Sequence, residues 1–276
     1  MIRSEPCKSR VLLADSVNFL DAGAHGTVVV SSSHGGVYAA YKAAASGARA
    51  VVLNDAGRGL DDAGIACLTY CGALGMAAAV VSHRTARIGE VADMMKRGII
   101  SGANPVAHAA GCREGMSCAE AAEELRAAPQ PSAEPPAYSE TRSVVSELPG
   151  SPRVVCIDSA SLVLPDDAGA IVVTGSHGGL IGGRKEKAFN VDALLAVFND
   201  AGIGVDEAGI GRLAPLDERG IAAATVDHLS ARIGDARSTY RDGVLSRLNL
   251  RAQRLGGEIG MRVSDFVERV LKEASH

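Results

Sequence analysis

The chain has 276 residues, of which 47% are hydrophobic, and a formal net charge of -4. Length and composition allow a substantial buried core, in one large domain or two small ones. The small negative charge argues against clustered lysine and arginine, with which proteins bind nucleic acids or anionic membranes. No apolar run approaches the roughly 18 residues of a membrane span. We therefore expect neither a nucleic-acid nor a membrane partner.

The N-terminal sequence and the cysteines point to the same compartment. Residues 1–6 contain no apolar signal core, which predicts a cytoplasmic protein. The six cysteines form no CxxC pair, so their spacing predicts neither a disulfide framework nor a zinc knuckle. They are best interpreted as small buried hydrophobic residues in a reducing compartment.

A series of short motifs occurs twice along the chain. Ser-His-Gly-Gly stands at 33–36 and 176–179, Asn-Asp-Ala-Gly at 54–57 and 199–202, and a His-x-x-Ala-Arg-Ile-Gly pattern at 83–89 and 228–234. The offset is 143 positions up to the first of these motifs and 145 thereafter. This pattern predicts a tandem duplication with repeats at 11–128 and 154–274. Between them, 129–153 is predicted to be a proline-rich, extended and loosely packed linker.

The predicted strands of the two repeats also correspond. Short apolar runs bounded by Gly and Asp favour buried strands at 11–14, 27–30, 50–53 and 77–81, and at 154–157, 170–173, 194–198 and 222–226. Helices are expected at 37–46, after a capping box formed by Ser117 and Glu120, and at 263–271. The fold class predicted is α/β, with two pseudo-two-fold-related, mainly parallel α/β halves.

The Ser-His-Gly-Gly motif follows the second predicted strand of each half. Consecutive glycines let the backbone turn and present amide hydrogens to an anion, and a following helix adds its dipole. His34 and His177 are therefore candidate catalytic residues. The candidate substrate-binding residues beside them are Ser33, Gly35, Gly36, Ser176, Gly178 and Gly179. The alternative is a tight strand-to-helix turn whose histidine bonds to a neighbouring carbonyl.

A second pair of histidines follows the fourth predicted strands. His83 and His228 are candidate catalytic residues, and Arg87 and Arg232, four positions later, are candidates for gripping a substrate carboxylate. Asp200 is the candidate that orients a histidine. Alternatively, each arginine pairs with a local acid and the Asn-Asp-Ala-Gly motifs are simple turns. Half two keeps more polar residues, which favours one site of unequal parts.

Together these residues predict an enzyme of hydrolase or lyase class that acts on a small anionic metabolite. The metabolite is carboxylated or cyclic and amide-like, and it is transformed by acid-base or hydrolytic chemistry in the cleft between the repeats. His-Gly-Gly resembles the oxyanion turn of lipases and esterases, but the chain has no Gly-x-Ser-x-Gly elbow, so that family is rejected.

Two further alternatives concern cofactors and the class of function. A divalent metal is left open, whereas no nucleotide cofactor is expected, because both dinucleotide and Walker motifs are missing from the sequence. The alternative class is a non-catalytic protein that binds or senses a small anion. A homo-oligomer is also left open.

Overall fold

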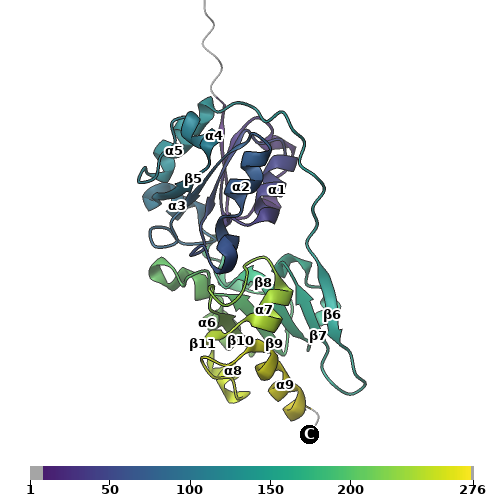
Figure 1. Ribbon diagram of the computed structural model, residues 1–276. Helices are drawn as coiled ribbons and strands as arrows, with labels where there is room; N and C mark the ends of the chain where they lie inside the picture. The colour runs from purple at the N-terminus through teal and green to yellow at the C-terminus, as the bar shows by residue number, and fades with distance from the viewer. Residues whose placement is uncertain (1–8, 275–276) are drawn as a thin grey trace, which may run out of the picture.

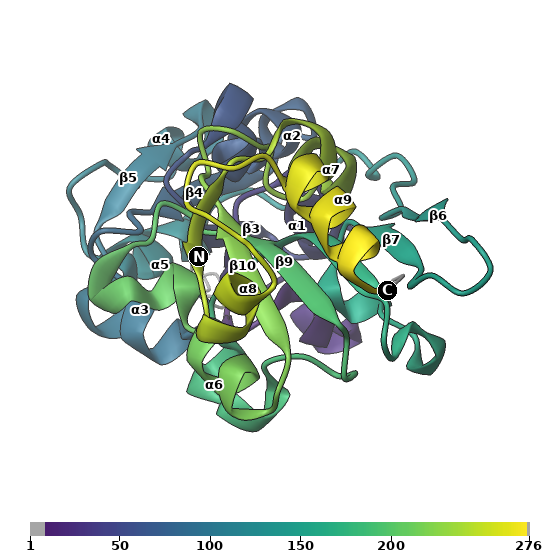
Figure 2. The ribbon, with the colours of Figure 1, turned by 90° about the horizontal axis from the view of Figure 1, so that it is seen from below.

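The computed structural model describes residues 9–274, which form two lobes, one from each half of the chain (Figure 1). Each lobe is built on a mostly parallel sheet flanked by helices, so the protein has an α/β fold. The helices α8 and α9 lie at the end of the molecule furthest from the first half, nearest the viewer in Figure 2.

The first sheet has five strands in the order of the sequence. Its strands β1 to β4 are parallel, and β5 is antiparallel to β4. Their bounds are β1 (Val11–Ala14), β2 (Val28–His34), β3 (Ala50–Asn54), β4 (Ala77–Val81) and β5 (Ile100–Ala103). The four apolar runs predicted for this half are all strands, and the antiparallel β5 is an additional one.

The second sheet has six strands, with β7 to β10 parallel and an antiparallel strand at each edge. Their bounds are β6 (Arg142–Ser146), β7 (Val154–Ile157), β8 (Ile171–His177), β9 (Leu195–Asn199), β10 (Ala222–Val226) and β11 (Leu245–Leu248). The order from β7 to β11 repeats the order from β1 to β5.

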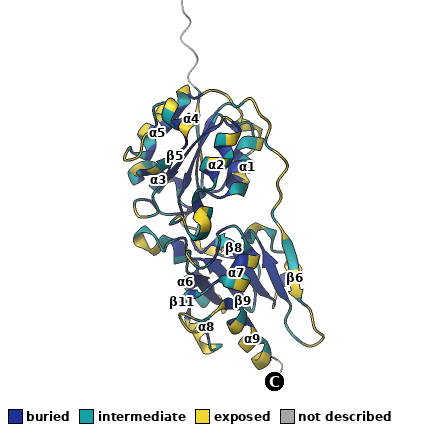
Figure 3. Ribbon diagram, in the orientation of Figure 1, coloured by how far each residue is buried: buried dark blue, intermediate teal, exposed yellow. Residues whose placement is uncertain are grey.

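Helices cover both faces of each sheet, so the central strands are buried on both sides (Figure 3). In the first half these are α1 (Val37–Ala45), α2 (Cys67–Ala73), α3 (Val91–Arg97), α4 (Pro105–Ala109) and α5 (Cys118–Glu124). The second half has α6 (Leu213–Glu218), α7 (Ala236–Asp242), α8 (Leu250–Arg254) and α9 (Val263–Ala274). The predicted capping box, Ser117 with Glu120, begins α5.

Alternation along the strands separates two cores in the first half. Val29 and Val51 belong to the core on the α1 and α2 side. Val28 and Val52, one position away, belong to the core that includes Met94 of α3. Because successive side chains of a strand point to opposite faces, each short apolar run supplies both cores. Among the described residues, no helix is long and apolar enough to cross a membrane.

The halves differ most after Ser-His-Gly-Gly. The first half continues into the helix α1, whereas the corresponding stretch of the second half forms only two 3-10 turns, Ile181–Gly183 and Lys185–Lys187. The two-residue change of offset falls in this stretch. The second half therefore places an irregular, charged segment where the first half has a helix.

The connection between the halves differs in part from the predicted linker. Residues 129–141 contain neither helix nor strand and run along one side of the molecule as a largely exposed chain (Figures 1 and 3). Residues 142–146, however, form β6 and pair with β7. Arg142 also forms an ion pair with the fully buried Asp167, at 2.8 Å. The second part of the predicted linker thus contains an edge strand of the second sheet.

The halves meet at the carboxyl ends of their parallel strands. A small apolar cluster joins the segments that follow β3, β4, β9 and β10, and consists of Ala56, Ile88, Ala201 and Ile233. Ligands of parallel α/β sheets bind beyond these strand ends, where the loops lie. The contact between the halves is therefore where a ligand is expected.

Candidate functional site

A cavity of about 350 Å³ lies between the halves. Its walls are the ends of β2 and β8, the segments that follow β1, β2, β7 and β8, one residue of the connecting chain, and Arg212, which lies between β9 and α6. Both Ser-His-Gly-Gly motifs contribute their serine and histidine: Ser33, His34, Ser176 and His177. The structure thus brings four predicted site residues from two distant parts of the sequence to one cavity.

The two histidines of this cavity are held in the same way. Each is the last residue of its strand, and its Nδ1 accepts a hydrogen bond of 3.1 Å from a backbone N–H, that of Gly36 for His34 and that of Gly179 for His177. An Nδ1 that accepts a hydrogen bond carries no proton, so each neutral ring carries its proton on Nε2. The alternative interpretation expected each histidine to bond to a carbonyl, whereas Nδ1 of each ring accepts a hydrogen bond from a backbone amide.

Burial keeps both rings uncharged. Burial lowers the pKa of His34 to about 4. Burial, followed by the nearby charge of Arg212, holds the pKa of His177 well below its ordinary value. Near neutral pH both imidazoles are therefore hydrogen-bond donors through Nε2–H. A neutral histidine of this kind polarises a carbonyl or stabilises a developing oxyanion.

The glycine amides that the sequence suggested for an anion already have hydrogen-bond partners within the protein. The amides of Gly36 and Gly179 are used by the histidines, and those of Gly35 and Gly178 donate to backbone carbonyls, each at 2.8 Å. These glycines serve close packing instead. A Cβ on Gly35 would lie 2.5 Å from the carbonyl oxygen of Gly64, and one on Gly178 would lie 2.6 Å from the corresponding carbonyl oxygen of the second half.

The two serines shape the cavity wall. The Oγ of Ser33 accepts a hydrogen bond from the amide of Val17, at 3.1 Å. The Oγ of Ser176 accepts one from the amide of Ala160, at 2.9 Å. Each serine thereby fixes the turn that follows the first strand of its own half, and that turn forms part of the wall.

Glu140, from the connecting chain, also lines the cavity. Burial, followed by the charge of Asp158, raises the pKa of its carboxyl group to about 7, while hydrogen bonds with Tyr38 and Ser159 and the charge of Lys42 act in the opposite direction. A carboxyl group with this pKa exchanges protons readily near neutral pH. No motif in the sequence indicated this residue, because Glu140 stands in a polar stretch without periodicity.

Arg212 is a second site residue that lies outside the predicted motifs. It is only 6% exposed and lines the cavity. Its Nε donates to the carbonyl of Gly179 at 3.0 Å, its Nη1 donates to the carbonyl of Ala188, and its guanidinium lies 5.2 Å from the centre of the Phe198 ring. Within residues 9–274, no carboxylate forms an ion pair with it. Burial lowers its pKa to about 10, so it stays charged at neutral pH.

Aligning the halves would have revealed Arg212. At the offset of 145 its counterpart is Cys67. The two positions are equivalent in backbone structure, because the amide of Arg212 donates to Gly178 and the amide of Cys67 donates to Gly35. A change from cysteine to arginine at a buried position is a signal that comparison of the halves could have found. Lys187, also a lining residue, adds a second cation.

The structure does not bring the second histidine pair to this cavity. His83 and His228 lie two residues beyond β4 and β10 and each reaches across to the other half. His83 contacts Gly202, and His228 contacts Gly57. Their carbonyls accept hydrogen bonds from backbone amides across the contact, at 2.9 Å and 2.8 Å respectively. Both line a separate, more open hollow of about 280 Å³.

The arginines beside these histidines also join the halves. Arg87 pairs with Asp206 at 2.8 Å, and Arg232 pairs with Asp61 at 2.5 Å. The alternative interpretation paired each arginine with a local acid. Arg87 does lie 3.3 Å from such an acid, Glu90, in addition to Asp206. These guanidinium groups are thus occupied by carboxylates of the protein itself.

Asp200 lies beside His228. The Nδ1 of His228 lies 3.2 Å from Asp200, and the first half has the same arrangement, with His83 2.8 Å from Asp55. The bond to Asp200 raises the pKa of His228, although burial opposes it. Both pairs are largely buried, and they support the contact between the halves.

No protein-family model, curated protein or solved structure matches this chain. The function proposed below therefore rests on the cavity and on the residues that line it.

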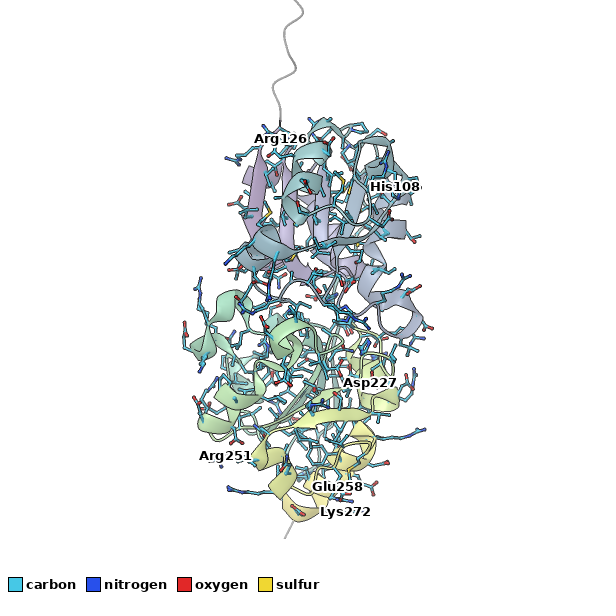
Figure 4. All side chains as sticks on the ribbon, turned by 90° about the vertical axis from the view of Figure 1, so that its left-hand side faces the viewer. His108, Arg126, Asp227, Arg251, Glu258 and Lys272 are labelled. Atoms are coloured by element: carbon cyan, nitrogen blue, oxygen red, sulfur yellow. The ribbon has the colours of Figure 1, made fainter. Side chains whose placement is uncertain are left out.

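One group in the described part of the chain has the composition of a metal site. Asp200, Asp227 and His228 offer ligand atoms within 4.8 Å of one another. A metal-bound histidine must be neutral, whereas these two carboxylates favour the protonated ring. Asp227, one member of this group, is labelled in the second half in Figure 4. The distances from Nδ1 of His228 to Asp200 and Asp227, 3.2 Å and 3.1 Å, also suit ion pairs within the protein.

Proposed function

We propose that the protein is an enzyme that acts on a small anionic molecule by acid-base chemistry in the 350 Å³ cavity. One observation carries the proposal: histidines from both Ser-His-Gly-Gly motifs share a cavity with a carboxyl group that titrates near pH 7. Polar groups with shifted pKa values that converge in a cavity between two lobes are typical of active sites. The volume suits a small metabolite.

The residues divide the chemistry between them. His34 and His177 donate hydrogen bonds from Nε2 to a carbonyl oxygen of the substrate, and stabilise the negative charge that develops there. Glu140, when ionised, takes a proton from the carbon next to that carbonyl or from an attacking water. A carboxylated carbonyl compound or a cyclic amide offers both groups. Proton abstraction and hydrolysis use the same residues in the same roles.

The test follows proton exchange, so the product need not be identified in advance. The protein is incubated in D₂O with small carboxylates and cyclic amides, and NMR records deuterium incorporation or conversion. For a molecule that reacts, Glu140→Gln should reduce the rate by roughly 10²- to 10⁴-fold. Glu147→Gln, directly after the strand β6, exposed and outside the cavity wall, is the matched control.

A second comparison isolates the Nε2–H donors. In His34→Asn the amide oxygen can still accept the hydrogen bond from Gly36, but the Nε2–H donor is lost. The rate should fall, whereas His108→Asn, outside the cavity wall, should leave it unchanged. Equal rates in Glu140→Gln and Glu147→Gln would refute the proposed role. A ligand that binds but neither reacts nor exchanges would favour the non-catalytic binding protein.

We also infer that the halves arose by duplication and are related by a pseudo-two-fold axis. The equal order of five strands and the reciprocal contacts of His83 and His228 support this inference. An experimental structure in which positions 145 apart fall at unrelated places of the two lobes would contradict it.

A further inference from the structure

The guanidinium of Arg212 is a buried charge in the cavity whose hydrogen bonds are incomplete. A guanidinium has five N–H donors. Bonds to Gly179 and Ala188 use Nε and Nη1, and no described residue accepts a hydrogen bond from Nη2. Burying a charge is unfavourable unless it is paired and hydrogen-bonded. Two carbonyls and the ring of Phe198 compensate only in part, which leaves the guanidinium able to take an anion from outside the chain.

The fold itself does not require an arginine here. Cys67 occupies the equivalent position of the first half, is fully buried, and makes the equivalent backbone hydrogen bond. A small apolar side chain thus suffices to pack this position. In the second half, where no helix replaces α1, Arg212 also holds the irregular segment through the carbonyl of Ala188, and the rest of its guanidinium faces the cavity that it lines.

We propose that Arg212 and Lys187 form a subsite for the carboxylate of the substrate, which orients the reacting carbonyl towards His34, His177 and Glu140. This inference rests on the proposed function for the identity of its ligand as substrate. It names the substrate class: a carbonyl or amide compound that also carries a free carboxylate. The anion binds to Nη2 of Arg212, and the exposed Lys187 adds its charge from the same wall.

The cavity favours a carboxylate over a phosphate. Phosphate sites in α/β proteins surround a doubly charged group with backbone amides, commonly at glycine-rich turns. Here the amides of both Gly-Gly pairs are already hydrogen-bonded within the protein. A planar guanidinium matches a planar carboxylate well without such a cradle.

The chain offers a matched control for loss of Arg212. Arg219 holds the same segment of the second half, through its bonds to the carbonyl of Phe189 at 2.5 Å and to Asp192 at 2.8 Å, but it does not line the cavity. Replacing either arginine loosens the segment around 188–192. Only replacement of Arg212 removes the charge that faces the ligand.

The experiment compares two small probes of nearly equal shape, sodium propionate and propionamide, at constant ionic strength. Binding to the full chain is measured by ligand-observed NMR and by the shift in melting temperature. Propionate should bind about 10-fold or more tightly than propionamide, because a hydrogen bond to a charged group is the stronger one. Arg212→Gln should abolish this preference, Lys187→Gln should reduce it, and Arg219→Gln should preserve it.

Several outcomes would overturn the subsite. These are equal binding of the two probes, an unchanged preference in Arg212→Gln, or tighter binding of inorganic phosphate than of propionate. Should Arg212→Gln fail to fold, the exposed Lys187→Gln still decides, since an unchanged preference would then count against the proposal. Glu140→Gln should retain propionate binding. Failure of the catalytic proposal, with binding but no turnover, is thereby distinguished from failure of the subsite.

Discussion

Two glycines at corresponding positions provide a direct test of how the halves meet. Gly89 and Gly234 both follow an Ala-Arg-Ile sequence, and their φ angles are +87° and +85°. An alanine at either position therefore carries the same backbone strain, about 1–2 kcal/mol. It also restricts the unfolded chain equally in both variants, so this contribution cancels when they are compared.

The surroundings of the two glycines differ. A Cβ on Gly89 would overlap the carbonyl oxygen of Leu180 in the second half, whereas at Gly234 the nearest atom would be Cε1 of His34, at 3.4 Å. The first contact forces backbone to move, and the second is ordinary van der Waals contact. Forcing extra atoms into a packed region costs about 1–3 kcal/mol. Adding this cost to the shared backbone strain, we expect Gly89→Ala to lose about 2–5 kcal/mol and Gly234→Ala about 1–2 kcal/mol.

Urea unfolding followed by circular dichroism measures both free energies of unfolding. We expect Gly89→Ala to be the less stable variant by about 2 kcal/mol, with a melting temperature lower by several degrees, since about 2–4 °C corresponds to 1 kcal/mol in a protein near this size. Losses equal within about 0.5 kcal/mol, the usual agreement between independent sites, would show that the turn at Gly89 does not press on Leu180. The described contact between the halves would then be wrong at this point.

Three further predictions concern titration and the connecting chain. The bond to Asp200 raises the pKa of His228, so protonation of this histidine stabilises the folded protein. This stability is fully present below the unfolded pKa near 6.5 and is lost as the pH rises through the folded pKa. In urea unfolding measured over this pH range, His228→Gln should show a smaller loss of stability. Burial, with Asp158, raises the pKa of Glu140 from 4.5 to about 7, so stability should fall as the pH rises between these values, and a Glu140→Gln variant that falls equally would contradict this. Limited proteolysis should cut within the exposed 131–139 before the paired strand β6, and first cuts within β6 would disprove its pairing with β7.

Much of the fold could be predicted from local patterns. Apolar runs of four or five residues bounded by Gly and Asp have no helical alternative of sufficient length, so β1, β3, β4, β7 and β10 were predicted within a residue of their observed bounds. The antiparallel strands β5, β6 and β11 could not, because each contains polar, half-exposed residues without a clear period. Their pairing depends on the neighbouring strand that they meet.

The candidate site shows the same division more sharply. The repeated motif identified His34 and His177, and the end of a parallel strand is a position that sequence predicts well. The close packing of the neighbouring glycines cannot be predicted from the sequence, because the backbone that approaches Gly35 belongs to Gly64, almost 30 positions along the chain. A glycine selected for close approach and one selected for anion binding leave the same letter in the sequence.

The sequence by itself determined the α/β class, the recurrence of motifs and the placement of four histidines at or just beyond strand ends. Only the tertiary structure decided that His34 and His177 share a cavity while His83 and His228 support the contact between the halves. It alone also added Glu140 and Arg212. The physical reason is that periodicity and turn chemistry act over a few residues. A cavity, a raised carboxyl pKa and an unpaired buried charge depend on which distant segments exclude water from one another.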